Sequence, residues 1–268
     1  MIKVGMISLG CPKNQVDAEM LLSRLSDAGF EIVGDVEADI VIINTCGFIG
    51  DAKKEAIDTI LEICQLKEEG IVGAVVVTGC LAQRYKDEIM KEIPEVDAVV
   101  GIGGNADIVS VCRDVIEKKK VGLFPPKLAL PLEGDRLLTT PPHYAYLKIA
   151  EGCSNCCTYC AIPKIRGKFR SREMENIISE AKSLAENGVK ELIVVAQDTT
   201  KYGIDLYGEL RLSELLRELC RIDGIEWIRT LYTYPERITD EFLDLLAREE
   251  KLVKYLDIPI QHANGEIL

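Results

Sequence analysis

Three cysteines stand close together near the middle of the sequence, where Cys153, Cys157 and Cys160 form the pattern Cys-x-x-x-Cys-x-x-Cys. Cysteine thiolates are the usual protein ligands of iron–sulfur clusters, and three of them on a 4Fe-4S cluster leave one iron without a protein ligand. An open coordination position is typical of a catalytic rather than a structural metal site. The spacing therefore predicts a 4Fe-4S cluster with one open iron.

Zinc is the alternative occupant of such a loop. Zinc sites commonly use four Cys or His ligands in two paired spacings with a closed shell. The nearest histidine after the loop is His262, far along the chain. The pattern therefore favours iron and sulfide over zinc.

A second set of cysteines, Cys11, Cys46 and Cys80, follows three apolar, strand-like runs. In a parallel sheet the carboxyl ends of the strands lie along one edge, where ligands bind in open α/β folds. The outer two of three adjacent strands are only ~10 Å apart. We therefore expect a second cluster with one open iron, and the alternative is three unrelated core cysteines. Cys64, Cys112 and Cys220 instead lie on apolar helical stripes and are interpreted as core residues.

The first half must position this second set. Strands are predicted over 3–9, 39–43, 74–78 and 97–102, and helices over 14–28, 51–69, 82–92 and 105–119. This alternation predicts an α/β domain over residues 1–120, with an open parallel sheet and helices on both faces. The proline-containing stretch 121–142 is predicted to be a linker.

The second half, residues 143–268, must position the cysteine loop. Strands are predicted over 144–150, 191–197, 226–232 and 254–259, and helices over 173–187, 212–222 and 239–249. These repeats predict a partial (β/α) barrel, in which chemistry takes place at the carboxyl ends of the strands. The loop follows the first of these strands, as that rule requires.

Composition and charge limit the possible functions. The chain has 268 residues and a formal net charge of −12, which suits a basic partner and makes direct binding to a nucleic-acid backbone unfavourable. No apolar run approaches the ~20 residues of a membrane span, and the start enters a strand without a signal peptide. We therefore expect a cytoplasmic protein that does not bind membranes, in which the ten cysteines do not form a disulfide framework.

The cysteine loop, with Tyr159 as the aromatic residue before its last cysteine, resembles the signature of radical S-adenosylmethionine (radical SAM) enzymes. Cys156 matches no ligand position in that signature and is interpreted as a spare thiol. Gln197 and Asp198, after the second strand of the barrel, are candidates for contacting the nucleoside cofactor or the substrate, although capping of a helix by Asp198 or Thr199 explains them equally well. The basic run 164–172 is either a solvated charge run or an anchor for a carboxylate or phosphate.

Nearly the whole chain resembles the radical SAM methylthiotransferase family. The segments that carry the resemblance are Leu9–Asp17, Asn44–Ile49, Gly79–Tyr85 and the cysteine loop. The sequences at 11–14, 47–49, 167–172 and 259–262 look like the RimO branch, which modifies an aspartate of small-subunit ribosomal protein number twelve. The MiaB-like branch, which acts on a tRNA adenosine, is the alternative. The acidic charge favours the basic ribosomal protein.

The resemblance implies two 4Fe-4S clusters with separate roles. Cys153, Cys157 and Cys160 would hold the cluster that binds S-adenosylmethionine, with Tyr159 among its neighbours, and that cleaves it to a 5′-deoxyadenosyl radical once a low-potential electron donor has reduced it. Cys11, Cys46 and Cys80 would hold an auxiliary cluster that carries the sulfur to be methylated and inserted at the β-carbon of the aspartate. The family usually continues with two further strands and a TRAM domain, so we expect this chain to be truncated.

A function of a different class is an electron-transfer module with two clusters and no chemistry on a substrate. Carrier clusters generally have complete cysteine ligation. Each set here is one cysteine short, which favours the enzyme.

Overall fold

The chain divides into two compact units. The computed structural model describes residues 1–34, 37–259, 264 and 266. The first unit comprises Met1–Thr139 together with Ser154–Lys168, and the second comprises Thr140–Cys153 together with the described residues from Phe169 onward. The loop that follows Cys153 thus belongs with the first unit, whereas the strands on either side of it belong with the second. The division into residues 1–120, a linker and 143–268 stays a prediction.

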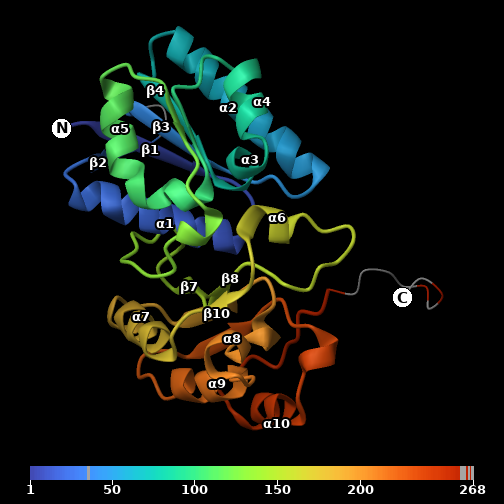
Figure 1. Cartoon of the computed structure of the whole chain (residues 1–268). Helices are drawn as coiled ribbons and strands as arrows, with labels where there is room; N and C mark the ends of the chain where they lie inside the picture. The colour runs from blue at the N-terminus through green and yellow to red at the C-terminus, as the bar shows by residue number, and fades with distance from the viewer. Residues whose placement is uncertain (35–36, 260–263, 265, 267–268) are drawn as a thin grey trace. The chain divides into compact units, whose positions relative to one another are not determined.

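A six-stranded sheet in the order β2-β1-β3-β4-β5-β6 forms the centre of the first unit (Figure 1). Every neighbouring pair of strands runs parallel. The strands are β1 (Lys3–Ser8), β2 (Glu31–Ile32), β3 (Ile40–Thr45), β4 (Ala74–Thr78), β5 (Ala98–Val100) and β6 (Val121–Leu123). β3 and β4 are fully buried. Each consists of an apolar run that ends in polar residues, and such runs are expected for central strands covered on both faces.

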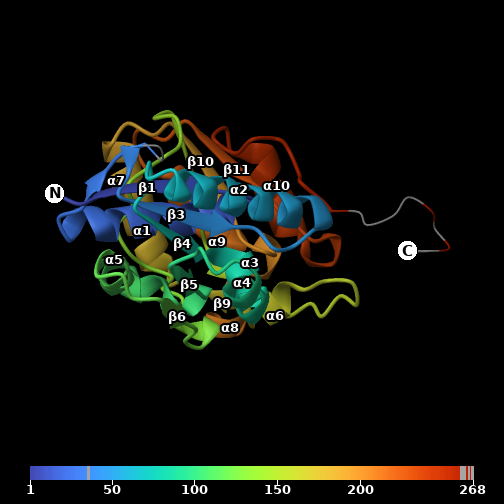
Figure 2. The same cartoon turned by 90° about the horizontal axis from the view of Figure 1, so that it is seen from above.

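Helices cover both faces of this sheet (Figures 1 and 2). The helices are α1 (Pro12–Asp27), α2 (Gly50–Glu68), α3 (Gly79–Arg84), α4 (Lys86–Glu92) and α5 (Ile108–Ile116), with a 3₁₀ turn, η2 (Ile102–Asp107), before α5. Alternate residues of β3 face opposite cores: Ile40 and Ile42 pack with α1 and α5, and Val41 and Ile43 pack with α2, α3 and α4. The predicted open parallel sheet with helices on both faces is confirmed. None of the described helices is both long and apolar enough to cross a membrane.

The second unit has a three-stranded parallel sheet in the order β11-β10-β7. Its strands are β7 (Tyr144–Lys148), β10 (Glu191–Val195) and β11 (Trp227–Thr230), and its longer helices are α7 (Met174–Glu186), α9 (Leu212–Cys220) and α10 (Asp240–Arg248). The shorter elements are β8 (Ala150–Glu151), β9 (Arg170–Ser171), η4 (Thr199–Lys201), α8 (Ile204–Tyr207) and η5 (Pro235–Arg237). β8 and β9 pair in antiparallel fashion, so that the chain leaves the second unit after β8 and re-enters it at β9.

Three local predictions differ from the structure. The helix predicted over 82–92 is two helices, because Tyr85 has non-helical backbone angles between α3 and α4. Residues 121–123, predicted to be linker, form the edge strand β6. The segment predicted to be a strand over 254–259 is irregular, and in it the Asp257 carboxylate, in place of a backbone carbonyl, accepts the hydrogen bond of the Tyr232 backbone N–H.

Gly79→Ala tests the tight join between β3 and β4. A Cβ at Gly79, where φ is +93°, would lie 2.5 Å from the Thr45 carbonyl oxygen and 2.6 Å from Asn44 Oδ1. We expect the free energy of local unfolding of β3 and β4, measured by hydrogen exchange, to fall by about 3 kcal/mol. Gly29→Ala is the matched control, since φ is +88° and a Cβ there meets nothing within 4 Å. Gly29→Ala should lower the free energy of unfolding by about 1 kcal/mol. An equal decrease in the two variants would contradict the prediction.

Candidate iron–sulfur site

The register of the first sheet places Cys11, Cys46 and Cys80 at the same edge. Ser8 pairs with Asn44 across β1 and β3, and Asn44 pairs with Thr78 across β3 and β4. The three cysteines follow this row of residues within three positions. The structure therefore brings together the three cysteines that the sequence predicted to meet.

Glycines beside the cysteines let their loops approach closely. A Cβ on Gly10 would lie 2.6 Å from the Cβ and 3.0 Å from the Sγ of Cys46. A Cβ on Gly47 would lie 3.0 Å from the backbone carbonyl carbon of Cys80. The loop of Cys11 thus packs on Cys46, and the loop of Cys46 packs on Cys80.

Two asparagines fix the ends of β1 and β3 beside this site. The Asn14 side-chain amide donates to the carbonyl oxygens of Leu9, Asn44 and Thr45, at 2.7, 3.2 and 3.3 Å. In return, the Asn44 amide donates to the Asn14 carbonyl oxygen at 2.7 Å. Within the described residues, the buried Asn44 Oδ1 has no hydrogen-bond partner. The backbone that carries Cys11 and Cys46 is therefore held before any ligand binds.

Two thiols of this set, those of Cys46 and Cys80, lie in a low-dielectric environment. Burial raises the pKa of the Cys80 thiol to about 11, opposed by the charge and hydrogen bond of Arg166. Burial also raises the pKa of Cys46, and the nearby Cys11 adds to that increase. Cys11 and Cys46 influence the pKa of Cys80 as well, so the three sulfur atoms lie within electrostatic reach of one another.

The cysteines of the other predicted cluster site, Cys153, Cys157 and Cys160, lie between β8 and β9. Cys153 is buried, Cys157 and Cys160 are partly exposed, and Cys156 is exposed with a left-handed backbone (φ 54°). Tyr159 is 64% exposed. The exposure of Cys156 agrees with its interpretation as a spare thiol.

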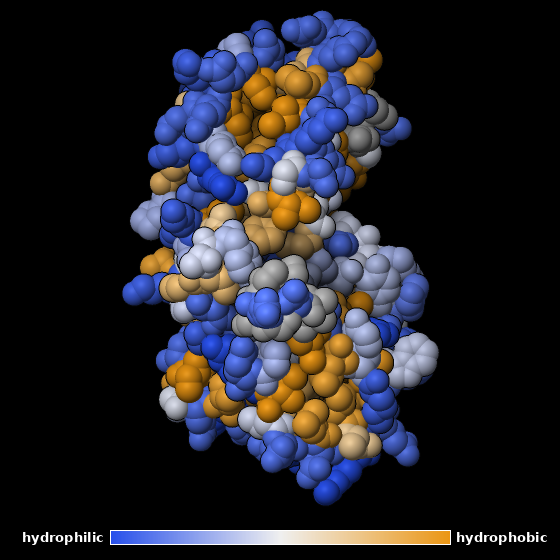
Figure 3. All heavy atoms as spheres, turned by 90° about the vertical axis from the view of Figure 1, so that its right-hand side faces the viewer, coloured by the Kyte–Doolittle hydropathy of each residue, from blue (hydrophilic) through white to orange (hydrophobic). Residues whose placement is uncertain are grey.

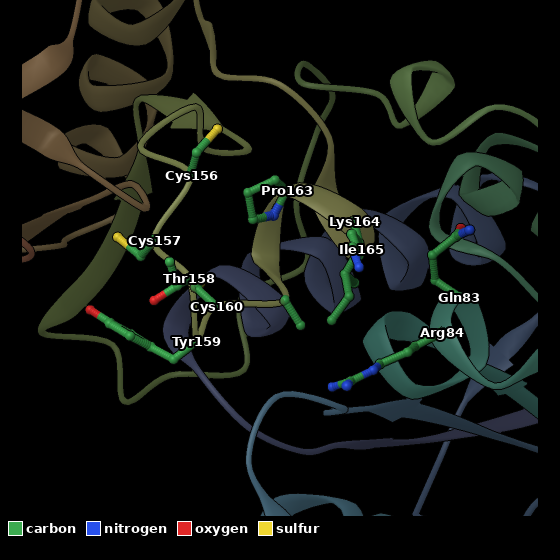
Figure 4. A pocket seen from close by; sticks show the side chains of 11 residues that line it. Gln83, Arg84, Cys156, Cys157, Thr158, Tyr159, Cys160, Pro163, Lys164 and Ile165 are labelled. Atoms are coloured by element: carbon green, nitrogen blue, oxygen red, sulfur yellow. The ribbon is translucent and has the colours of Figure 1, made fainter.

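A hollow of about 650 Å³ opens beside this loop within the first unit. Cys157, Tyr159 and Cys160 line one side, and Gln83 and Arg84 of α3 line the other (Figure 4). α3, which contains Cys80, thus also forms one wall of the hollow beside the cysteine loop. A small molecule can reach Cys157 and Cys160 from this hollow.

Arg166 connects the same loop to the other cysteine set. It ends the short helix α6 (Ile162–Arg166), which packs against α3. Its guanidinium is buried and donates to Asp17 Oδ2 at 2.6 Å, to Asn14 Oδ1 at 3.0 Å and to the Cys80 sulfur at 3.3 Å. The basic run 164–172 is therefore not uniformly solvated. Arg172 is buried too, and it bonds Glu180 and the Lys148 carbonyl oxygen within the second unit.

The structure gives Asp198 partners within the second unit. Its carboxylate is fully buried, accepts a hydrogen bond from the Thr200 hydroxyl at 2.7 Å and pairs with Arg237 at 2.9 Å. It occupies the position before η4 but makes no capping hydrogen bond with its side chain. Gln197 is partly exposed beside it. Gln261 and His262, which belong to the last motif, lie outside the described residues.

The donor set at the first sheet fits an iron–sulfur cluster. Thiolates are the soft ligands that such clusters select, and three of them converge on this edge. In the described part of the chain, no three His, Cys, Asp or Glu side chains are grouped tightly enough to hold a single metal ion. A cluster separates its cysteine ligands, because each thiolate binds a different iron. Cys64 and Cys112 are buried and Cys220 is partly buried, in agreement with their interpretation as core residues.

Sequence reasoning missed the polar residues that support the cysteines. Asn14, Asp17 and Arg166 are adjacent in the structure, yet Arg166 is far from the other two in the sequence. Only one local signal was available: Asn14 and Asp17 are three residues apart, a spacing that puts both on one face of α1.

A separate hollow of about 740 Å³ lies on the first unit between α2 and α4. Its floor is apolar, with Ile57 and Leu61 of α2 and Ile89 of α4, and charged side chains flank it (Figure 3). None of the cysteines lines it.

The fold and the cysteine loop are those expected of a radical SAM protein, and comparison with protein families agrees. Residues 3–101 match the family described as "Uncharacterized protein family UPF0004", and residues 147–268 match the radical SAM superfamily. Two family models thus match successive parts of the chain, UPF0004 first and the radical SAM superfamily second.

Individual relatives confirm the family resemblance that the motifs indicate. The ribosomal protein uS12 methylthiotransferase RimO of Clostridioides difficile is 53% identical over 270 residues, and the alignment covers 100% of this chain and 61% of that protein. The protein of the same name from Acetivibrio thermocellus is 57% identical over 275 residues, covering 99% and 60%. The chain thus spans about three-fifths of the length of these relatives.

Solved structures confirm the fold. The radical S-adenosylmethionine methyltransferase TsrM from Kitasatospora setae, with cobalamin and a [4Fe-4S] cluster bound, gives a TM-score of 0.68 at 15% identity, covering 99% of this chain and 61% of that one. The cobalamin-dependent radical enzyme OxsB gives a TM-score of 0.53 at 13% identity, covering 92% and 41%. At such low identity, the likeness concerns the fold alone.

Alkylation of the reduced, cluster-free chain tests the environments of the cysteines. We expect iodoacetamide to modify the exposed Cys156 first and the buried Cys80 much later. A thiol with a pKa of about 11 is thiolate about a hundredfold less often near pH 8 than an ordinary cysteine, and only the thiolate reacts. The rate at Cys80 should therefore keep rising as the pH approaches 11. Peptide mapping by mass spectrometry measures both rates, with the urea-unfolded chain as control. Equal rates at Cys80 and Cys156 in the folded chain would contradict the assignment.

Proposed function

We propose that this chain is the catalytic part of a radical SAM methylthiotransferase that attaches a methylthio group to the β-carbon of an aspartate in ribosomal protein uS12. The substrate is inferred from relatives that are more than half identical to this chain and are named as uS12 methylthiotransferases. We expect it to act in the cytoplasm and to receive electrons from a low-potential donor.

One structural observation carries the proposal for two clusters. Cys11, Cys46 and Cys80 meet at the carboxyl edge of the first sheet, and the loop with Cys157 and Cys160 belongs to the same unit. We assign the first set to the auxiliary cluster and Cys153, Cys157 and Cys160 to the cluster that binds S-adenosylmethionine. When bound, the two clusters supply reductive cleavage of that cofactor and the sulfur to be transferred.

The chain's own residues hold and orient these groups. Asn14 and Asn44 fix the backbone beside Cys11 and Cys46, and Gly10 and Gly47 allow the loops to approach. Tyr159, Gln197 and Asp198 stay our candidates for contacting S-adenosylmethionine. Since the Asp198 carboxylate is already engaged by Arg237 and Thr200, its contact with the cofactor would require one of these bonds to be shared.

The acidic charge favours a protein substrate over RNA. A formal net charge of −12 repels a phosphate backbone and attracts a basic protein. The charge therefore agrees with uS12 rather than a tRNA adenosine as the target.

Product analysis tests this function. We expect the anaerobically reconstituted chain, given S-adenosylmethionine, sulfide and a strong reductant, to add one methylthio group to uS12, detected by peptide mass spectrometry at an aspartate. Transfer RNA incubated in parallel should gain no mass. A methylthio group on tRNA alone would move the protein to the other branch. If 5′-deoxyadenosine does not form under conditions that load both clusters, the chain is not a radical enzyme and the electron-transfer function stands.

Cys11→Ala tests whether the two clusters have separate roles. We expect it to abolish methylthiolation and leave cleavage of S-adenosylmethionine measurable, because Cys11 belongs to the auxiliary set alone. The iron content should fall by about half, from about eight atoms per chain. Cys156→Ala is the matched control and should keep both the iron and both activities, since this thiol is exposed in the loop. Equal loss of cleavage and transfer in Cys11→Ala would argue against separate roles.

A further inference from the structure

Arg166 is a buried cation that is aimed at a cysteine sulfur. Its side chain is 1% exposed, and its guanidinium pairs with the equally buried carboxylate of Asp17. A buried ion pair of this kind needs no third partner for charge balance. Arg166 nevertheless points Nε–H at the Cys80 sulfur at 3.3 Å while one terminal nitrogen, NH1, bonds Asp17.

The forked shape of the guanidinium lets Arg166 donate hydrogen bonds to Asp17 and to Cys80 at the same time. Arginine presents its N–H donors in a rigid plane, whereas lysine carries a single ammonium. With Asp17 and Asn14 holding the two terminal nitrogens, the direction of Nε–H is fixed. The sulfur it meets is the least exposed of its set, at 7% exposure for Cys80 against partial exposure for Cys11 and Cys46. A hydrogen bond counts most where water does not compete for the sulfur.

We propose that Arg166 is a positioning residue that tunes the auxiliary cluster by donating a hydrogen bond to its Cys80 ligand. This inference rests on the proposed function, because it takes Cys80 as a cluster ligand. Hydrogen bonds to cluster sulfurs and nearby charge set the reduction potential of iron–sulfur clusters. Arg166 therefore makes the auxiliary cluster easier to reduce. Since it ends the helix that follows Cys160, it also connects the loop of one cluster to the ligand of the other.

The test uses the whole chain with substitutions that leave only the auxiliary cluster. Cys153→Ala, Cys157→Ala and Cys160→Ala are combined as the parent chain, and its potential is measured by redox titration followed by electron paramagnetic resonance. Arg166→Gln is combined with Asp17→Asn, so that no buried carboxylate loses its partner. Arg166→Lys keeps the charge without the fork. The matched control is Arg136→Gln with Glu19→Gln, which removes another buried arginine–carboxylate pair whose carboxylate, like that of Asp17, lies on α1.

We expect Arg166→Gln/Asp17→Asn to lower the equilibrium constant for one-electron reduction about tenfold, the size of one charge-assisted hydrogen bond. This corresponds to a shift of about 59 mV to more negative potential. The Arg166→Lys chain should bind as much iron as the parent chain. Its reduction potential should also become more negative, but by a smaller amount. The Arg136→Gln/Glu19→Gln control should leave the equilibrium constant for reduction within about threefold of the parent value.

A measurement on Arg166 itself, in the parent chain, tests the inference even if the Arg166 variants fail to bind the cluster. In the parent chain labelled with ¹⁵N-arginine, electron–nuclear double resonance should detect a nitrogen coupled to the cluster, and Arg166→Lys should remove it. A potential that is unchanged in the Arg166 variants, or the absence of coupling in the parent chain, would overturn the inference. Failure of the parent chain to assemble any cluster would instead overturn the assignment of Cys11, Cys46 and Cys80, and with it the proposed function.

Discussion

The close packing of three loops at one edge of a parallel sheet is the constraint on which the first unit depends. Parallel strands place their carboxyl ends together, but loops with ordinary side chains would hold the cysteines apart. Gly10 and Gly47 remove the obstructing Cβ atoms, and the reciprocal hydrogen bonds of Asn14 and Asn44 replace backbone pairing where the strands stop. The site is therefore preorganised by backbone contacts rather than by the metal.

Periodicity and topology made much of the first unit predictable from its sequence. The strands β1, β3, β4 and β5 and the helices α1 and α2 have clear apolar patterns, because each must bury one or both faces. The short edge strands β2 and β6 have no such pattern, and the sequence did not predict them. Parallel pairing then predicts that Cys11, Cys46 and Cys80 follow neighbouring strand ends at one edge of the sheet. The break at Tyr85 and the irregular segment at Asp257 could not be predicted in this way. Each depends on a side chain or a backbone angle that only the tertiary structure selects.

The sequence alone does not reveal which side chains pair with one another at the site. A run of basic residues after a cysteine loop looks the same whether its side chains are solvated or buried. Arg166 is buried because Asp17, distant in sequence, offers a carboxylate at 2.6 Å. Without that partner, the cost of removing the cation from water would keep it at the surface. The chemistry of the run is therefore determined by long-range pairing and not by its composition.

The basic run 164–172 passes from the first unit to the second and has a buried ion pair in each. Arg166 is anchored in the first unit by Asp17, and Arg172 is anchored in the second by Glu180. Gly167, with φ of +86°, lies immediately after the first anchor. A left-handed residue at this point ends α6 and lets the chain change direction without strain. Each buried arginine thus fixes its own end of the segment that follows the cysteine loop, through an ion pair within one unit.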